Sequence, residues 1–130
     1  MPLTVAPAGA PARFEPLAVA VPDRLVDELR RACAVVDDPG ERAAAGRDWW
    51  PLTMLWARRG EIPARPGVIA RPETAGQVAA VLRACNDARV PVTPVAGRSG
   101  VCGASVPVFG GVALEVTAID GIAGVDTDSL

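Results

Sequence analysis

A glycine-rich segment, Val95 to Ser105, carries the residue types with the clearest chemistry in the sequence. Glycine recurs at every third position of this segment: Gly97, Gly100 and Gly103. Glycines allow a sharp backbone turn and let backbone N–H groups approach an anion with no Cβ in the way. Ser99 and Ser105 add hydroxyl donors, and Arg98 adds a positive charge. Such a set of donors is suited to the phosphates of a diphosphate.

The spacing of these glycines by itself leaves two interpretations open. The signature of a dinucleotide-binding βαβ unit, G-x-G-x-x-G, is absent, and no clear helix follows the segment, so a Rossmann nucleotide site is not favoured. A glycine-rich turn between two strands is more often a plain connection than a ligand site. The spacing therefore predicts either a phosphate-binding loop or a simple link between strands.

The absence of three residue types excludes several reaction mechanisms. The chain contains no Lys, no His and no Tyr, so arginine supplies all 13 basic side chains. A Walker-type phosphate loop and a Schiff-base enzyme each need a lysine, and a Ser or Cys nucleophile usually needs a histidine as its base. None of these mechanisms is expected, and no catalytic residue is assigned in this chain.

The three cysteines are scattered and lack the paired spacing of a zinc site, so no metal site is expected. Their odd number indicates reduced thiols in a cytoplasmic protein. Cys33 and Cys85 fall on apolar helix faces and are expected in the core. Cys102 lies inside the glycine-rich segment, where it could be a redox thiol, although a small buried hydrophobe is the favoured interpretation.

Other chemistry-bearing side chains are expected to have structural roles. The three tryptophans could stack on a flat ligand, but aromatic residues at a helix start usually pack against the protein. They are Trp49, Trp50 and Trp56. The acidic pairs Asp37/Asp38 and Asp126/Asp128 are typical of turns, and no pocket for acid–base work can be placed around them.

The composition indicates one soluble globular domain. Hydrophobic residues make up 50% of the 130 positions, charged residues 22%, and the net charge is −2. No basic stripe suits a nucleic acid. The longest uncharged stretch, residues 99–114, is too short and too rich in Gly and Pro to span a bilayer. Neither a nucleic-acid partner nor a membrane span is expected.

The N-terminal part divides into a leader and a helical segment. Residues 1–20 form a Pro/Ala-rich leader, which we expect to be mobile or loosely docked. Residues 21–62 form the helical segment. Its apolar residues recur at helical spacing from Pro22 to Val36, which predicts an amphipathic helix stopped by the run at residues 37–40.

A second, shorter helix is predicted later in the same segment. Asp48 is a candidate N-cap and Pro51 suits the first turn. Arg58 and Arg59 lie where a helix C-terminus favours cations, and Gly60 is the stop.

Residues 63–130 alternate between strands and helices. The predicted elements are a strand at 68–70, a helix from the T-x-x-Q capping box at Thr74 to about Arg89, a short strand at 90–95, the glycine-rich segment, and a strand at 112–116. This order predicts an α/β fold with a small parallel sheet and a crossover helix. Ligands of such sheets bind at the carboxyl ends of the strands.

Two ordered motifs in this part resemble a known family. They are RPGVIARPET at residues 65–74 and VPVTPVAGRSG at residues 90–100. They resemble the start of the FAD-binding domain of the vanillyl-alcohol oxidase/PCMH flavoprotein superfamily, which includes glycolate oxidase subunits, D-lactate dehydrogenases and alkyldihydroxyacetonephosphate synthase. Residues 111–126 are similar to the next strand of that domain and the turn after it. The resemblance covers residues 66–130.

In that family, a loop of the form V-P-V-x-P-x-G-G-G-T-S-x-x-G wraps the FAD diphosphate. The resemblance assigns cofactor binding to Pro94, Val95, Ala96, Gly97, Arg98, Ser99, Gly100, Gly103, Ala104 and Ser105. Ala96 replaces the first loop glycine, which is tolerable only if that residue keeps a negative φ. Arg98 stands where a third glycine is usual, and it either pairs with phosphate or is a solvated loop arginine. Since no histidine is present for a covalent link, the resemblance implies non-covalent FAD, with Cys102 as a conceivable alternative link.

The resemblance also implies a function, and it implies which part of a larger protein the chain represents. It implies a PCMH-type FAD-binding subdomain preceded by a helical segment, and the N-terminal piece of a larger flavoenzyme whose catalytic groups lie downstream. The first hypothesis is an oxidoreductase that passes hydride from a 2-hydroxy acid or similar alcohol to FAD. The alternatives are an alkyldihydroxyacetonephosphate-synthase-like transferase and a non-catalytic interaction module that binds no ligand.

Overall fold

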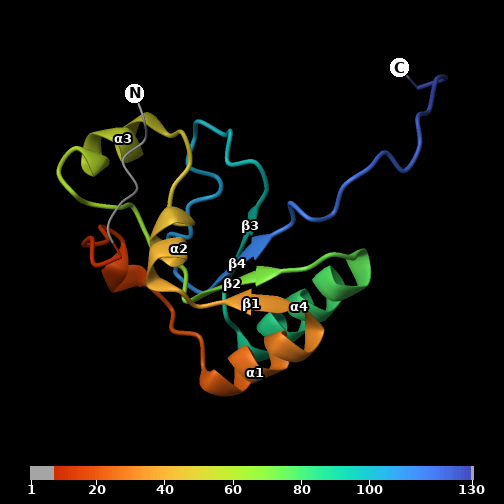
Figure 1. The fold of residues 1–130 in the computed structure, drawn as a ribbon, viewed down its shortest axis with the longest axis horizontal. Coiled ribbons are helices and arrows are strands. Elements are labelled where there is room, and N and C mark those ends of the chain that lie inside the picture. The colour runs from red at the N-terminus through yellow and green to blue at the C-terminus, as the bar shows by residue number, and fades with distance from the viewer. Residues whose placement is uncertain (1–7, 130) are drawn as a thin grey trace.

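The computed structural model describes residues 8–129, which form a small sheet with helices on both faces (Figure 1). In chain order the elements are a 3-10 helix η1 (Glu15–Leu17), α1 (Asp23–Ala32), β1 (Ala34–Val36), α2 (Pro39–Ala44), α3 (Pro51–Ala57), β2 (Val68–Arg71), α4 (Ala75–Ala88), β3 (Val92–Val95) and β4 (Val112–Glu115). This confirms the predicted α/β class and each strand and helix predicted between residues 63 and 116.

The sheet has the strand order β1-β2-β4-β3. Strands β2, β4 and β3 are parallel, and β1 is antiparallel to β2. Helix α4 connects β2 to β3 across the place that β4 fills, as a crossover connection. The carboxyl ends of the three parallel strands therefore meet at one edge of the sheet, which is where the glycine-rich segment begins.

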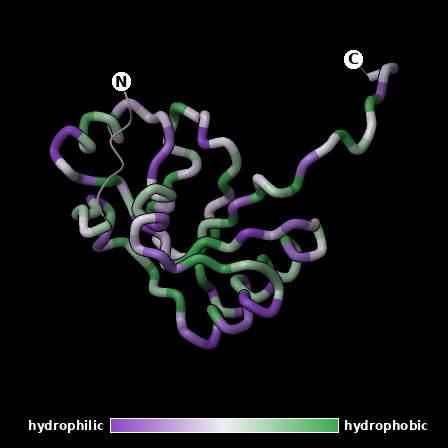
Figure 2. The backbone as a smooth tube through the Cα atoms, in the orientation of Figure 1, coloured by the Kyte–Doolittle hydropathy of each residue, from purple (hydrophilic) through white to green (hydrophobic). Residues whose placement is uncertain are grey.

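Alternating side chains of the strands form a core on each face of the sheet. On one face, Val68 and Leu114 pack with Leu25 and Leu29 of α1 and Val81 of α4. On the other face, a smaller cluster packs together: Val36, Ala45, Ile69, Val95 and Ala113. Figure 2 shows hydrophobic residues concentrated in the strands at the centre of the fold. The period of two along β2 and β4 thus places each strand between two apolar layers.

The start of α4 follows its sequence signal. Thr74 is the N-cap, and its hydroxyl accepts a hydrogen bond from the backbone N–H of Gln77 at 3.2 Å. At the other end, Arg89 is the C-cap in the left-handed conformation with φ +54°. The predicted N-cap at Thr74 is confirmed, whereas the Gln77 side chain accepts the backbone N–H of Glu73 at 2.6 Å, one residue before the N-cap.

The first helix is shorter than predicted. It ends at Ala32, and residues 34–36 leave the helix to pair with β2 as β1. Two β-branched residues in this run, Val35 and Val36, gain ladder hydrogen bonds and sheet packing that a last helical turn would not provide. The prediction of a helix up to Val36 is therefore wrong.

A helix also replaces the predicted stop at residues 37–40. Helix α2 begins at Pro39, and the Asp38 carboxylate accepts the N–H of Glu41 at 2.9 Å as its N-cap. The sequence carries this signal, because Asp followed by Pro at the first helical position and Glu two residues later is a typical helix start.

The leader is tied to the body of the protein from residue 8 onward. Ala12 forms a β-bridge with Ile62, and Val19 forms another with Gly110. The Arg65 guanidinium donates hydrogen bonds to the carbonyls of Ala8 and Ala10. Of the two expectations for the leader, mobile or loosely docked, these contacts favour a docked segment for residues 8–20, because prolines that prevent regular structure leave carbonyls free to accept from other parts of the chain. Residues 1–7 lie outside the described residues.

After β4 the chain extends away from the sheet (Figure 1). Residues 117–129 contain no helix or strand and are exposed along almost their whole length. Between residues 8 and 129, no helix has the length and apolar character needed to cross a membrane.

Candidate functional site

The glycine-rich segment presents a run of backbone donors that the protein does not use. It follows β3 directly, at the carboxyl edge of the parallel strands. Within residues 8–129, none of the backbone amides from residue 96 to residue 105 donates a hydrogen bond to the protein. In the same described range, the hydroxyls of Ser99 and Ser105 have no partner either. These donors are available to an acceptor from outside the chain.

The space around two of the glycines is open. A Cβ built on Gly97 would meet no atom within 4 Å, and one on Gly100 would meet only the Asp48 carboxylate, at 3.7 Å. The third glycine is needed for the fold, since Gly103 has φ +80° and its Cβ would lie 2.9 Å from the Trp50 ring. The absence of side chains at Gly97 and Gly100 therefore serves no internal packing, which is the property expected where backbone meets a ligand.

The two departures from the family loop are accommodated differently. Ala96 is not among the residues with positive φ, so the condition for its presence is met. Arg98 has φ +51°, the left-handed region that favours glycine. The residue that stands where a glycine is usual thus keeps a backbone conformation typical of glycine.

The Arg98 side chain belongs to a series of ion pairs. Its Nη2 donates to Oε2 of Glu115 at 2.8 Å, and Oε1 of Glu115 accepts from Nε of Arg71 at 3.2 Å. Arg71 in turn donates to Glu41 at 2.7 Å, and this hydrogen bond is the largest cause that raises the pKa of Arg71. The alternative of a freely solvated loop arginine is therefore wrong. The four side chains connect the loop, the ends of β4 and β2, and α2.

Residues 48 and 49, which precede α3, contact the glycine-rich segment. The N–H of Trp49 donates to the carbonyl of Gly100 at 3.0 Å. The Asp48 carboxylate is 7% exposed; its Oδ1 accepts the N–H of Trp50 at 2.9 Å, and its Oδ2 is buried with no hydrogen-bond partner. Asp48 is therefore not the N-cap of α3, a position that Trp50 occupies. Sequence reasoning missed its contact with the loop, because no local pattern relates Asp48 to a glycine that lies far along the chain.

Two of the tryptophans pack as predicted. The rings of Trp50 and Trp56 meet edge to face with centroids 5.5 Å apart, and Phe14 contacts Trp56 in the same manner at 5.9 Å. Trp49 is 47% exposed, so it is not part of this cluster's interior.

The three cysteines divide by burial. Cys33 and Cys85 are buried, as predicted, whereas Cys102 is exposed. The interpretation of Cys102 as a buried hydrophobe is wrong, because the loop that carries it lies over the surface of the protein. Among the described residues, no group of His, Cys, Asp and Glu could hold a metal ion.

We expect this difference to appear as selective thiol chemistry. Burial raises the pKa of Cys85 to about 11 and also raises the pKa of Cys33, so neither thiol supplies thiolate at about pH 8. An alkylating reagent should modify Cys102 in the native protein and all three thiols only after unfolding, as measured by mass spectrometry. Rapid native modification of Cys85 would contradict the packing of α4.

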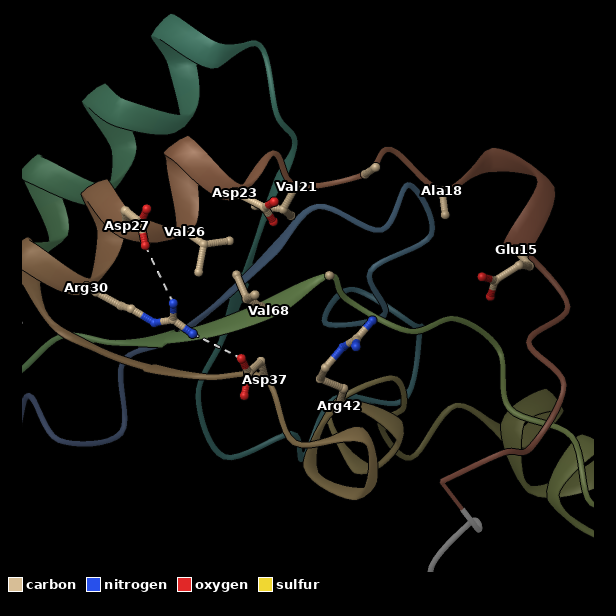
Figure 3. Close-up of a pocket in the computed structure, with 12 residues that line it drawn as sticks. Glu15, Ala18, Val21, Asp23, Val26, Asp27, Arg30, Asp37, Arg42 and Val68 are labelled. Atoms are coloured by element: carbon tan, nitrogen blue, oxygen red, sulfur yellow. Dashed lines mark hydrogen bonds and ion pairs between the residues drawn. The ribbon is translucent and has the colours of Figure 1, made fainter.

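A cavity of about 650 Å³ lies away from the loop, at the amino end of β2 (Figure 3). Its charged lining is mainly acidic: Glu15, Asp23, Asp27 and Asp37, with Arg30 and Arg42. Arg30 is already paired with Asp27 at 3.6 Å and Asp37 at 3.0 Å. An anionic ligand would be repelled by this lining, so the cavity is a poor site for a diphosphate.

The donor set of the loop fits the diphosphate of FAD. Phosphate oxygens only accept hydrogen bonds, and the loop offers unused amides, unused hydroxyls and a guanidinium at the carboxyl edge of a parallel sheet. The loop glycines leave room for backbone to approach the phosphates. The residues present are therefore compatible with this cofactor.

The chain matches one protein-family model and is similar in sequence to parts of several longer proteins. A family model described as an FAD binding domain matches residues 66–130. A D-lactate dehydrogenase from Anaerostipes hadrus is 38% identical over 66 residues, which cover 51% of this chain and 14% of the relative. The mitochondrial D-2-hydroxyglutarate dehydrogenase of Bos taurus is 32% identical over 115 residues, which cover 87% of this chain and 19% of that protein. The chain thus spans less than a fifth of either relative.

Solved structures agree on the fold. An alkyldihydroxyacetonephosphate synthase matches with a TM-score of 0.73 at 20% identity, covering 84% of this chain and 23% of that one. p-Cresol methylhydroxylase matches with a TM-score of 0.63 at 19% identity, covering 95% of this chain and 22% of that one. These matches confirm the PCMH-type fold for the part of the domain present. Because the family model covers half of the sequence and the fold agrees with it, the chain belongs to the FAD binding domain family.

Proposed function

We propose that residues 94–105 bind the diphosphate of FAD in a flavin-dependent oxidoreductase. The observation that carries this proposal is the run of unused amides at residues 96–105, at the carboxyl edge of the parallel strands, inside the region matched by the FAD-binding family. The proposed contacts are Pro94, Val95, Ala96, Gly97, Arg98, Ser99, Gly100, Gly103, Ala104 and Ser105. When bound, FAD supplies the hydride acceptor, and this chain's residues hold and orient its phosphates.

The proposed substrate of the whole protein is a small 2-hydroxy acid. Two relatives are named as dehydrogenases of such acids, D-lactate and D-2-hydroxyglutarate. The likeness to alkyldihydroxyacetonephosphate synthase concerns the fold alone, at 20% identity, so it does not favour a transferase. We propose non-covalent attachment, because the chain has no histidine to form a flavin link.

The loop assignment can be tested on the 130-residue chain by nuclear magnetic resonance. FAD is titrated into ¹⁵N-labelled protein, and the amide signals are followed residue by residue, a measurement that also detects weak binding. We expect the largest shifts at residues 96–105, because these amides would exchange water for phosphate oxygen.

Two comparison ligands make this titration decisive. ADP-ribose carries the same diphosphate without the flavin and should shift the same amides, whereas riboflavin, which has no phosphate, should not. Shifts confined to the acidic cavity at the amino end of β2, or no shifts with either diphosphate, would contradict the proposal.

A further inference from the structure

Arg98 has an unusual position for a loop residue at the candidate site. It has a left-handed backbone with φ +51°, and its side chain is only partly exposed. This backbone conformation is disfavoured for any residue with a Cβ, unless the contacts of its side chain compensate. Glu115 supplies one such contact, at 2.8 Å.

The guanidinium of Arg98 is incompletely satisfied. Within residues 8–129 its hydrogen-bond partner is Glu115 alone, through Nη2, and its Nε is buried with no acceptor. A buried donor without an acceptor is costly, so Arg98 has the capacity to gain a further charged hydrogen bond. A phosphate oxygen is a suitable acceptor, because guanidinium and phosphate form two parallel hydrogen bonds.

Glu115 has a second cationic partner. Its Oε1 accepts from Arg71 at 3.2 Å, and its side chain is 14% exposed. If Arg98 moves to another anion, Glu115 therefore remains neutralised at the end of β4. Breaking a buried ion pair is usually costly because it leaves a buried charge without a partner. Here Arg71 still pairs with Glu115 when Arg98 leaves, so this cost is avoided.

We propose that Arg98 exchanges Glu115 for the cofactor diphosphate and forms a direct guanidinium–phosphate contact in this chain's loop. The proposal rests on the proposed function, because it requires the diphosphate to bind at residues 94–105. Arg98 lies in the loop that contributes the unused amides. Its partner Glu115 is the last residue of β4, the strand that neighbours β3. Glu115 is then a competitor of the phosphates for Arg98.

The two members of this ion pair should have opposite effects on affinity. Arg98→Gly and Arg98→Asn both suit a left-handed backbone and remove the cation, so each should raise the Kd for FAD and for ADP-ribose about tenfold or more. Glu115→Gln removes the competitor and should lower both Kd values a few-fold. Added salt should weaken binding by the native chain more than binding by the Arg98 variants.

Arg89→Gly provides a matched control. Arg89 also has a left-handed backbone, with φ +54°, but it caps α4 before β3 begins, at the opposite end of the sheet from the loop. Its replacement removes the same charge and the same backbone strain, and should leave both Kd values unchanged. Thermal unfolding of each variant without ligand verifies that it is folded.

The outcomes separate this proposal from the proposed function. If the native chain and Arg89→Gly bind FAD, but both Arg98 variants bind within twofold of them, the exchange is refuted and the loop assignment stands. Weaker binding by Glu115→Gln would likewise overturn the exchange, because it would mean that Glu115 supports the loop instead of competing. If the native chain binds neither diphosphate, the proposed function fails and this inference fails with it.

Discussion

Replacement of Gly97 by valine is expected to abolish FAD binding while leaving the unfolding temperature unchanged. The Cβ of residue 97 would contact no protein atom within 4 Å, and the backbone there is not left-handed, so the free protein can accept the side chain. In the complex, however, a branched side chain would occupy the space where the loop backbone meets phosphate. We expect Kd to rise more than about tenfold, a loss of at least about 1.4 kcal/mol of binding free energy.

Gly124→Val is the appropriate comparison for this experiment. Gly124 also has open space around its Cα, but it lies in the extended segment after β4. Isothermal titration and thermal unfolding are measured on both variants and on the native chain. Native-like affinity in Gly97→Val would remove residue 97 from the phosphate contact, whereas a lowered unfolding temperature would show that the open space is misassigned.

Replacement of Leu29 by alanine is expected to lower the free energy of unfolding by about 2–5 kcal/mol. Leu29 is 0% exposed and lies in the cluster that joins α1 to α4 and to the sheet. Removal of its side chain loses the apolar transfer free energy and leaves a cavity between elements that cannot fully close. Since small domains are stable by only about 5–15 kcal/mol, this change is a large fraction of the total.

Leu52→Ala tests whether burial causes this effect. Leu52 is a leucine in helix α3 with a side chain that is 43% exposed. Its replacement should change the free energy of unfolding by roughly 0.5 kcal/mol or less, as measured by denaturant titration. If Leu29→Ala and Leu52→Ala lowered the free energy of unfolding equally, α1 would not cover the sheet.

The stability of the folded protein is expected to depend on pH through a cysteine in this core. Burial raises the pKa of the Cys85 thiol from 9.0 to about 11, so above pH 9 the folded protein retains a proton that the unfolded chain releases. Because the folded state then binds more protons, this thiol contributes stability that is lost as the pH rises from 9 to about 11.

The second half of the fold could be predicted from the sequence because its signals are local. Thr74 and Gln77 fix the start of α4 by a hydrogen bond between near neighbours. Strands β2 and β4 each begin with three consecutive apolar residues, which suit a strand buried on both faces. The sequence resemblance then identified the glycine loop, because several ordered motifs agree over residues 66–130.

The first half could be predicted less well because its structure depends on distant partners. Ala34–Val36 continues a helical pattern, yet it becomes a strand since β2 offers an antiparallel edge to pair with. The leader is held by Arg65, and its own composition does not record this contact.

The sequence by itself determined the order of strands and helices from residue 63 onward and the absence of histidine and lysine chemistry, and it predicted which loop would bind a diphosphate. Only the tertiary structure decided that Asp48 lies against Gly100, that Arg98 is paired with Glu115, and that Cys102 is exposed. The physical reason is range: caps and periodicities arise between residues a few positions apart, whereas these contacts join residues that only the folded sheet and its loops bring together.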